Sequence, residues 1–181
     1  AGRRTGTELV PTTLEGFVSI ENLTGGTGDD DFNVAAALDG NLDGGAGSND
    51  LVLDIATGSI GGNVTNVNVT ASIGGTAGDD TIIVRRNTLG QIEVDRDGVI
   101  NTLFIPATQT DVTLNVDVSA TAGSDTLIVD YRFGDLPINI VYTANDVTDD
   151  LQILDDGTRS VSYTPDQAVL GKGTINTALN G

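Results

Sequence analysis

Strict alternation of apolar and polar residues is the feature that most limits how this chain can fold. In residues 111–120, Val112, Leu114, Val116 and Val118 alternate with polar residues, and a period of two is typical of a half-buried strand. The same alternation recurs in eight shorter segments: 32–38, 51–55, 67–73, 82–84, 127–131, 138–142, 151–153 and 161–163. Residues 91–104 are expected to form a β-hairpin closed by Asp97-Gly98, because a tight hairpin turn needs positive φ. One short helical turn within 166–173 is the single helix candidate, so the chain is predicted to be all-β.

Glycine- and aspartate-rich turns precede several of these strands. Residues 25–33, GGTGDDDFN, match the nonapeptide G-G-x-G-x-D-x-U-x, in which U is a large apolar residue, without a mismatch. Three further segments match in part, and one is degenerate: 44–52, 75–83, 120–128 and 144–152. The second has Asn49 at the aspartate position, followed by Asp50. In each match the apolar residue begins the next strand.

Such a turn can provide oxygen ligands for a metal ion. Glycines let backbone carbonyls converge, and the aspartate two residues after the fourth-position glycine adds a carboxylate. Calcium takes six to eight oxygen ligands, and stacked turns could share each ion. The predicted metal ligands are Gly26, Gly28, Asp30, Gly45, Gly47, Asn49, Asp50, Gly78, Asp80, Gly123 and Asp125. No cofactor other than Ca²⁺ is expected.

These turns resemble the repeats-in-toxin (RTX) family of calcium-binding β-roll and β-helix modules. The longer segment 19–54 is also similar to parts of very large bacterial surface proteins and adhesins. The resemblance implies a calcium-stabilised parallel β-solenoid on the outside of a cell. In tandem arrays of that family one coil takes about eighteen residues, close to the 19-residue step from Gly28 to Gly47.

The spacing of the turns is irregular. The fourth-position glycines Gly28, Gly47, Gly78 and Gly123 are separated by 19, 31 and 45 residues, which suggests coils that accept progressively longer excursions. We therefore expect residues 1–181 to form one irregular parallel β-solenoid with a hairpin excursion, with a possible subdivision near 56–66. A β-sandwich is the alternative architecture.

Composition excludes several classes of function. The chain has 8 basic and 26 acidic residues and a formal net charge of −18, so nucleic acid and anionic membrane surfaces would repel it. It lacks cysteine and histidine, which excludes disulfides, thiol catalysis and the usual zinc sites. No segment has the length and apolarity of a membrane span.

Function is predicted to be structural and non-catalytic: a calcium-stabilised module, spacer or stalk of a bacterial or archaeal surface or secreted protein. Its expected partners are calcium ions and either further copies or neighbouring domains. Two alternatives stay open, namely a self-assembling subunit of a filament or surface layer, and a polysaccharide-acting β-helix enzyme. Two local alternatives also stay open: the turns could be plain surface turns, and residues 39–50 could form an EF-hand-like loop.

Overall fold

The computed structural model describes residues 22–103, 112–144, 148–157, 159–165 and 172–179. These residues form strands and turns, and no helix is present among them. The all-β prediction is therefore confirmed, whereas most of the proposed helical turn within 166–173 lies outside the described residues.

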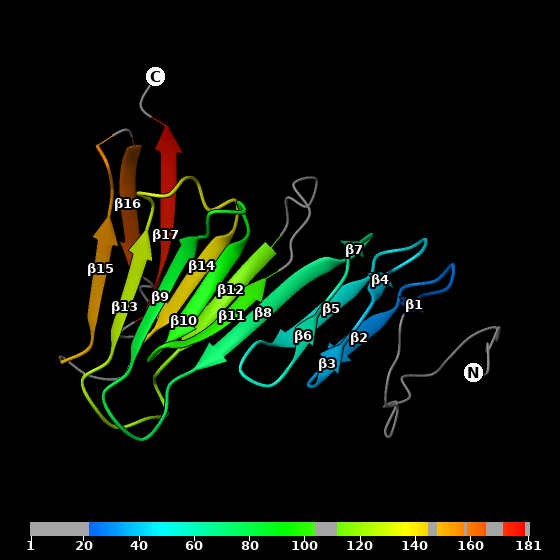
Figure 1. Ribbon diagram of the computed structural model, residues 1–181, viewed down its shortest axis with the longest axis horizontal. Helices are drawn as coiled ribbons and strands as arrows, with labels where there is room; N and C mark the ends of the chain where they lie inside the picture. The colour runs from blue at the N-terminus through cyan, green and yellow to red at the C-terminus, as the bar shows by residue number, and fades with distance from the viewer. Residues whose placement is uncertain (1–21, 104–111, 145–147, 158, 166–171, 180–181) are drawn as a thin grey trace.

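A seven-stranded sheet runs along the molecule (Figure 1). In spatial order it contains β16 (Arg159–Pro165), β17 (Lys172–Leu179), β14 (Asn139–Thr143), β12 (Val112–Asp117), β8 (Asn68–Gly74), β5 (Asp50–Asp54) and β2 (Asp31–Val34). The five strands from β14 to β2 are parallel to one another, whereas β17 pairs antiparallel with both β14 and β16. Because β5 pairs directly with β8, this sheet is continuous across residues 56–66.

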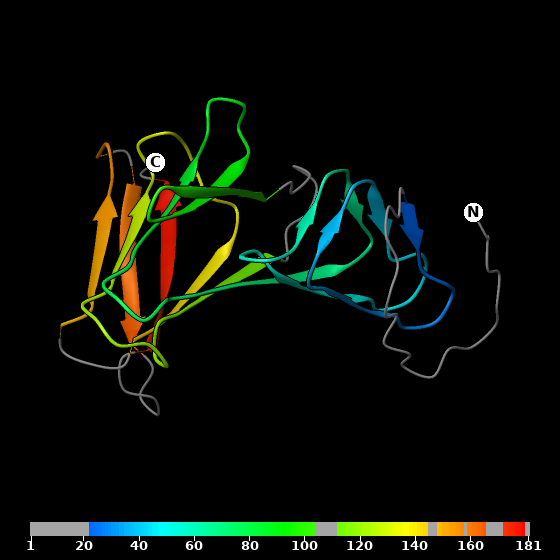
Figure 2. The ribbon, with the colours of Figure 1, turned by 60° about the horizontal axis from the view of Figure 1, so that its bottom comes forward.

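Three smaller sheets complete the fold. The five-stranded sheet has the order β11 (Val99–Leu103), β10 (Ile92–Arg96), β9 (Thr81–Arg86), β13 (Thr126–Asp130) and β15 (Asp150–Leu154). A three-stranded parallel sheet contains β1 (Asn22–Thr24), β4 (Asn41–Asp43) and β7 (Val64–Thr65). A two-stranded parallel sheet pairs β3 (Ala37–Leu38) with β6 (Ser59–Ile60). β1 to β7 lie towards one end of the molecule, and β13, β15, β16 and β17 lie towards the other (Figure 2).

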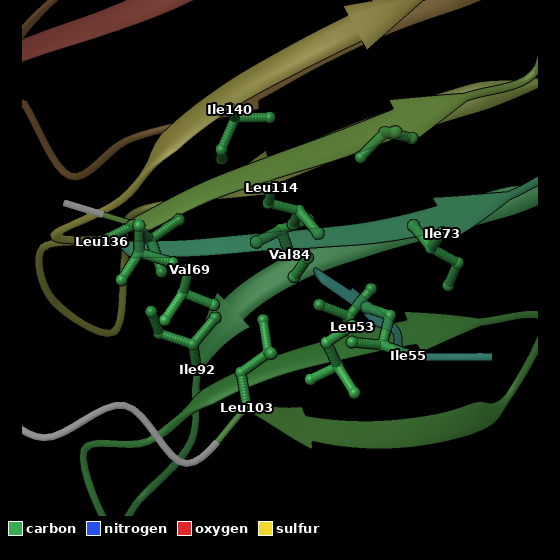
Figure 3. Packing of buried hydrophobic residues seen from close by; sticks show 14 of the residues in the cluster. Leu53, Ile55, Val69, Ile73, Val84, Ile92, Leu103, Leu114, Leu136 and Ile140 are labelled. Carbon is green, nitrogen blue, oxygen red and sulfur yellow. The ribbon is translucent and has the colours of Figure 1, made fainter. Parts of the chain in front are cut away.

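Most apolar residues of the alternating segments lie in one continuous core, whereas Ala36 and Tyr163 are exposed. Val112, Leu114, Val116 and Val118 are each no more than 1% exposed, whereas Ala120, beyond the end of β12, is exposed. Figure 3 shows side chains of the seven-stranded sheet, such as Leu114 and Ile140, gathered with Val84 and Ile92 from the five-stranded sheet. Burying these residues from both sheets holds the strands in one register, because a one-residue shift would expose the whole apolar set.

The predicted hairpin is present and covers a sheet edge. β10 and β11 pair around Asp97 and Gly98, which have φ of 52° and 84°, as a two-residue turn with positive φ at both positions requires. β10 also pairs antiparallel with β9, so the hairpin closes one side of the parallel strands β9, β13 and β15. Between β9 and β10, the guanidinium of Arg85 forms ion pairs with Glu93 and with Asp95.

Candidate functional site

The glycine–aspartate turns lie in two separate stacks. Turns 25–30 and 44–49 connect the three-stranded sheet to the seven-stranded sheet, and we call them the amino-terminal column. Turns 75–80 and 120–125, together with Asp149, connect the seven-stranded sheet to the five-stranded sheet and form the carboxy-terminal column. Gly47 and Gly78 therefore belong to different columns, and the 31 residues between them do not form one longer coil. The prediction that the intervals of 19, 31 and 45 residues form one series of growing coils is corrected accordingly.

A ladder of hydrogen bonds joins the sixth residues of successive turns. In the amino-terminal column, the backbone N–H of Asp30 donates to Asn49 Oδ1 at 2.9 Å. In the carboxy-terminal column, the N–H of Asp80 donates to Asp125 Oδ1 at 2.8 Å, and the N–H of Asp125 donates to Asp149 Oδ1 at 3.1 Å. Each side chain thus holds the backbone of the preceding turn.

The side chains of Asp30, Asp80 and Asp125 also accept hydrogen bonds within their own turns. Asp30 Oδ2 accepts from Gly26 N–H at 2.8 Å, and Asp80 Oδ2 accepts from Thr76 N–H at 2.6 Å. Where the second glycine is replaced, threonine adds a further donor: Thr76 Oγ1 donates to Asp80 Oδ1 at 2.9 Å. Threonine at this position therefore strengthens the turn, and the loss of glycine has a structural reason.

The fifth residues of the turns form a second series of hydrogen bonds. Ser48 N–H donates to Asp29 Oδ1 and Ser124 N–H donates to Asp79 Oδ1, both at 2.8 Å. A serine N–H and an aspartate carboxylate form this bond in both columns. The two columns are therefore built in the same way, although they connect different pairs of sheets.

The glycines are required where one turn lies directly against the next. A Cβ on Gly45 would lie 2.4 Å from Gly26 O, and one on Gly47 would lie 2.4 Å from Gly28 O. Gly123 has the same relation to Gly78 O, at 2.6 Å. These predicted ligands are thus brought together by backbone stacking, and the 19-residue step between Gly28 and Gly47 is a contact between neighbouring turns, as expected.

Asn49 differs from the other ladder residues because it must donate as well as accept. Its Oδ1 accepts from Asp30 N–H, while its Nδ2 donates to Asn66 O at 3.0 Å. The side chain is 2% exposed, and a carboxylate there would face the Asn66 carbonyl oxygen without a hydrogen. The sequence predicts Asn49 as a metal ligand in place of the aspartate of the motif, and in the structure its side-chain amide completes the ladder.

Asp50 lies outside the ladder. It is exposed at the start of β5, and its Oδ1 accepts from Asn68 Nδ2 at 3.0 Å. Residues 39–50, which match an EF-hand loop in spacing, contain β4 and lead into β5, whereas an EF-hand loop lies between two helices.

The hairpin turn takes the place of a preceding turn in the carboxy-terminal column. Thr81 N–H donates to Asp97 Oδ1 at 2.8 Å, and Asp97 N–H donates to Thr81 O at 3.1 Å. Arg96 Nη1 donates to Gly74 O at 2.7 Å, which places its charge near Asp80. The sequence predicts the hairpin but not this contact, because Asp97 and Thr81 are brought together only by the pairing of β9 with β10.

Asp80 is kept ionised although it is 1% exposed. Burial acts to raise the pKa of Asp80, but the hydrogen bonds donated by Thr76, with the contributions of the neighbouring Asp97 carboxyl group and of the charge of Arg96, outweigh burial and lower the pKa below its ordinary value. A buried carboxylate held by several donors is stable in its charged form. The carboxy-terminal column therefore retains negative charge at neutral pH.

The donor chemistry of the turns suits a hard cation, but the carboxylates are engaged with the backbone. Carboxylate and carbonyl oxygens are the ligands that calcium prefers, and those are the groups the turns contain. Among the described residues, however, no three acidic, histidine or cysteine side chains gather so that they could hold a metal ion. Any ion at these turns would take most of its ligands from backbone carbonyls.

Comparison with known proteins yields no relative: no family model, curated protein or solved structure matches the chain. Within the part of the chain that the structure describes, there is also no helix suited to crossing a bilayer.

Proposed function

We propose that this chain is a non-catalytic structural module, an irregular parallel β-solenoid that serves as a spacer or stalk in a surface or secreted protein. The carrying observation is the ladder in which the side chains of Asn49, Asp125 and Asp149 accept from the backbone N–H of the preceding turn. Successive parallel strands that are each preceded by a turn stacked on the previous one favour a solenoid over a β-sandwich.

The state of the buried acids favours a structural role over catalysis. A general acid for glycoside cleavage needs a raised pKa, whereas the pKa of Asp80 is lowered. Among the described residues, no buried side-chain nitrogen or oxygen lacks a hydrogen-bond partner. Each of these buried groups is thus bonded within the protein itself, which favours a structural role.

Calcium is proposed to stabilise the folded module. Support comes from the complete nonapeptide match at 25–33, from the oxygen donors of the turns and from the net charge of −18. A divalent cation would relieve the repulsion between stacked carboxylates, and binding to the folded state alone would increase its stability. Because extracellular fluids are rich in calcium relative to the cytosol, this mechanism suits a protein that works outside the cell.

A calcium titration of the chelator-treated protein tests this role. Thermal unfolding followed by circular dichroism is expected to shift to higher temperature with calcium, and less so in Asp30→Ala and Asp80→Ala. Asp135→Ala removes one exposed carboxylate outside the turns and is the charge-matched control, so it should respond to calcium as the wild type does. A protein whose unfolding ignores calcium would remove the ion from the proposal and leave the hydrogen-bonded ladder as the whole stabilising device.

A further inference from the structure

Within the described part of the chain, two strands at opposite ends of the molecule have no strand paired to their outer side. Among the described residues, β2 is the last strand of the seven-stranded sheet and β15 is the last strand of the five-stranded sheet. Figures 1 and 2 both place β15 at the end of the molecule away from β1 and β2. An unpaired strand edge is a template for pairing with another strand.

The apolar residues of these two strands are less buried than their equivalents inside the sheets. Phe32 on β2 is half-buried, while its register partner Leu51 is 1% exposed. Leu151 on β15 is half-buried, while its partner Leu127 is also 1% exposed. Both ends thus expose apolar surface that one more strand would cover.

The turn that precedes β2 has room for another turn to stack against it. A Cβ on Gly47 would collide with the preceding turn, but a Cβ on the equivalent Gly28 would meet nothing within 4 Å. Asp30 Oδ2 accepts from Gly26 N–H, whereas no donor among the described residues reaches Asp30 Oδ1. In the ladder this oxygen accepts from the N–H of a preceding turn, as Asp125 Oδ1 does from Asp80.

β15 matches the strand that such a neighbour would contribute. The sequences at the start of β2, β5 and β15 are DFNV, DLVL and DLQI, each with Asp followed by an apolar residue, any residue and a second apolar residue. β2 and β5 already pair in parallel with Asp31 opposite Asp50. Pairing of β15 with β2, with Asp150 opposite Asp31, would repeat that arrangement.

We propose that the chain assembles head to tail, with β15 of one copy pairing in parallel with β2 of the next copy. Residues 1–21 contain no Asp, no Asn and no adjacent glycines, which are the residue types of turn 25–30, whereas a second copy of the chain contains them. Because the two edges lie at opposite ends, the contact does not close on itself and gives an open filament. This inference rests on the proposed solenoid arrangement but not on calcium.

Charge sets the condition for assembly. Each copy has a net charge of −18, and such copies repel one another at low ionic strength. Raising the salt concentration screens that repulsion. We therefore expect the weight-average mass of the full chain, measured by light scattering, to increase with protein concentration and to increase further with sodium chloride.

Proline substitutions can block each edge separately. The N–H of Asp30 and the carbonyl of Asp30 both bond towards the neighbouring turn and β5, so alternation directs the N–H of Asn33 outward. Likewise Asp150 N–H bonds to Asp125 O, which directs the N–H of Ile153 outward. Proline is tolerated on the outer side of an edge strand, so Asn33→Pro and Ile153→Pro should fold and should each remove one contact.

Mixing the two variants tests the direction of pairing. Each alone should remain monomeric, and an equimolar mixture should form a 1:1 dimer of about twice the monomer mass, because Asn33→Pro keeps its β15 edge and Ile153→Pro keeps its β2 edge. A wild type that stays monomeric at every concentration and salt level would overturn the proposal, as would assembly of either variant alone. A monomeric wild type that loses stability on Asn33→Pro would instead assign the β2 edge to a segment of the same chain. Mass and calcium-dependent unfolding are separate readouts, so either proposal can fail without the other.

Discussion

Asp80 and Asp125 are 45 residues apart in the chain, yet the backbone N–H of the first donates to the carboxylate of the second at 2.8 Å. Both side chains are 1% exposed. The bond is one step of a ladder in which the side chain of one turn accepts from the backbone N–H of the turn before it. It gives the aspartates of these turns a role in the fold that needs no ligand.

Removing one member of the ladder should be costly. Asp125→Ala leaves the N–H of Asp80 buried without an acceptor, and we expect a loss of about 1–3 kcal/mol in the free energy of unfolding. Asp125→Asn is the matched control, because it retains Oδ1 as the acceptor and should lose much less. Urea denaturation followed by circular dichroism measures both; equal losses would show that the charge of Asp125, and not its hydrogen bond, stabilises the turn.

The opposite substitution at Asn49 should also destabilise the protein. Asn49→Asp removes the donor to Asn66 O and places a charge at a site that is 2% exposed. We expect a loss of about 1–3 kcal/mol, decreasing as the pH is lowered through the titration of the new carboxyl group. The nonapeptide consensus would lead to the reverse expectation, since it has aspartate at this position, so greater stability of Asn49→Asp would favour the metal-site interpretation.

Two glycines of equivalent position should respond differently to alanine. Gly47 has φ of 113° and its Cβ would lie 2.4 Å from Gly28 O, while a Cβ on Gly28 would meet nothing within 4 Å. Gly47→Ala is expected to cost well over about 1 kcal/mol. Gly28→Ala should change the unfolding free energy of the monomer by no more than about 0.5 kcal/mol in either direction. Similar losses from the two substitutions would contradict the stacking of turns 25–30 and 44–49.

Acid should destabilise the protein through its buried carboxylates. The hydrogen bond from Arg132 is the main reason why the pKa of Asp130 is lowered, and Thr76, Asp97 and Arg96 together overcome burial to lower the pKa of Asp80. A carboxyl group with a lower pKa in the folded state contributes stability above its unfolded pKa of about 3.9, and that contribution is lost as pH falls through the folded value.

Stability is therefore expected to be level from neutral pH to about pH 5 and to fall below about pH 4. Denaturant midpoints at a series of pH values measure this dependence. Asp80→Asn should have a shallower fall than the wild type, and an unchanged pH profile would show that Asp80 does not carry the linkage.

Much of the local structure follows from sequence because it depends on near neighbours. The alternation of Val112, Leu114 and Val116 predicts a half-buried strand, and Asp97-Gly98 predicts a hairpin turn from the φ values that these residues tolerate. The contact of Gly28 with Gly47 could also be expected, since their spacing is close to one coil. In each case the information lies within about twenty residues of chain.

The arrangement of the turns into two columns could not be derived in that way. Whether turn 75–80 stacks on turn 44–49 depends on where β8 ends and on which sheet the chain enters next. The role of Asn49 depends on Asn66, and that of Asp80 depends on Asp97 and Asp125. These partners are set by the pairing of whole strands, so no motif of nine residues contains them.

The two columns also differ in the length of chain that must be ordered before their turns can meet. The bond between Asp30 and Asn49 spans 19 residues, and that between Asp80 and Asp125 spans 45. The entropy lost on closing a loop grows with its length, so the second closure costs about 0.8 kcal/mol more than the first. Contacts between residues that are near in sequence form faster than contacts between distant residues. β8 begins beside the amino-terminal column and ends at the carboxy-terminal column. Folding should accordingly start at the amino-terminal column and proceed through β8, which then acts as the template on which β12 and β14 are added in order.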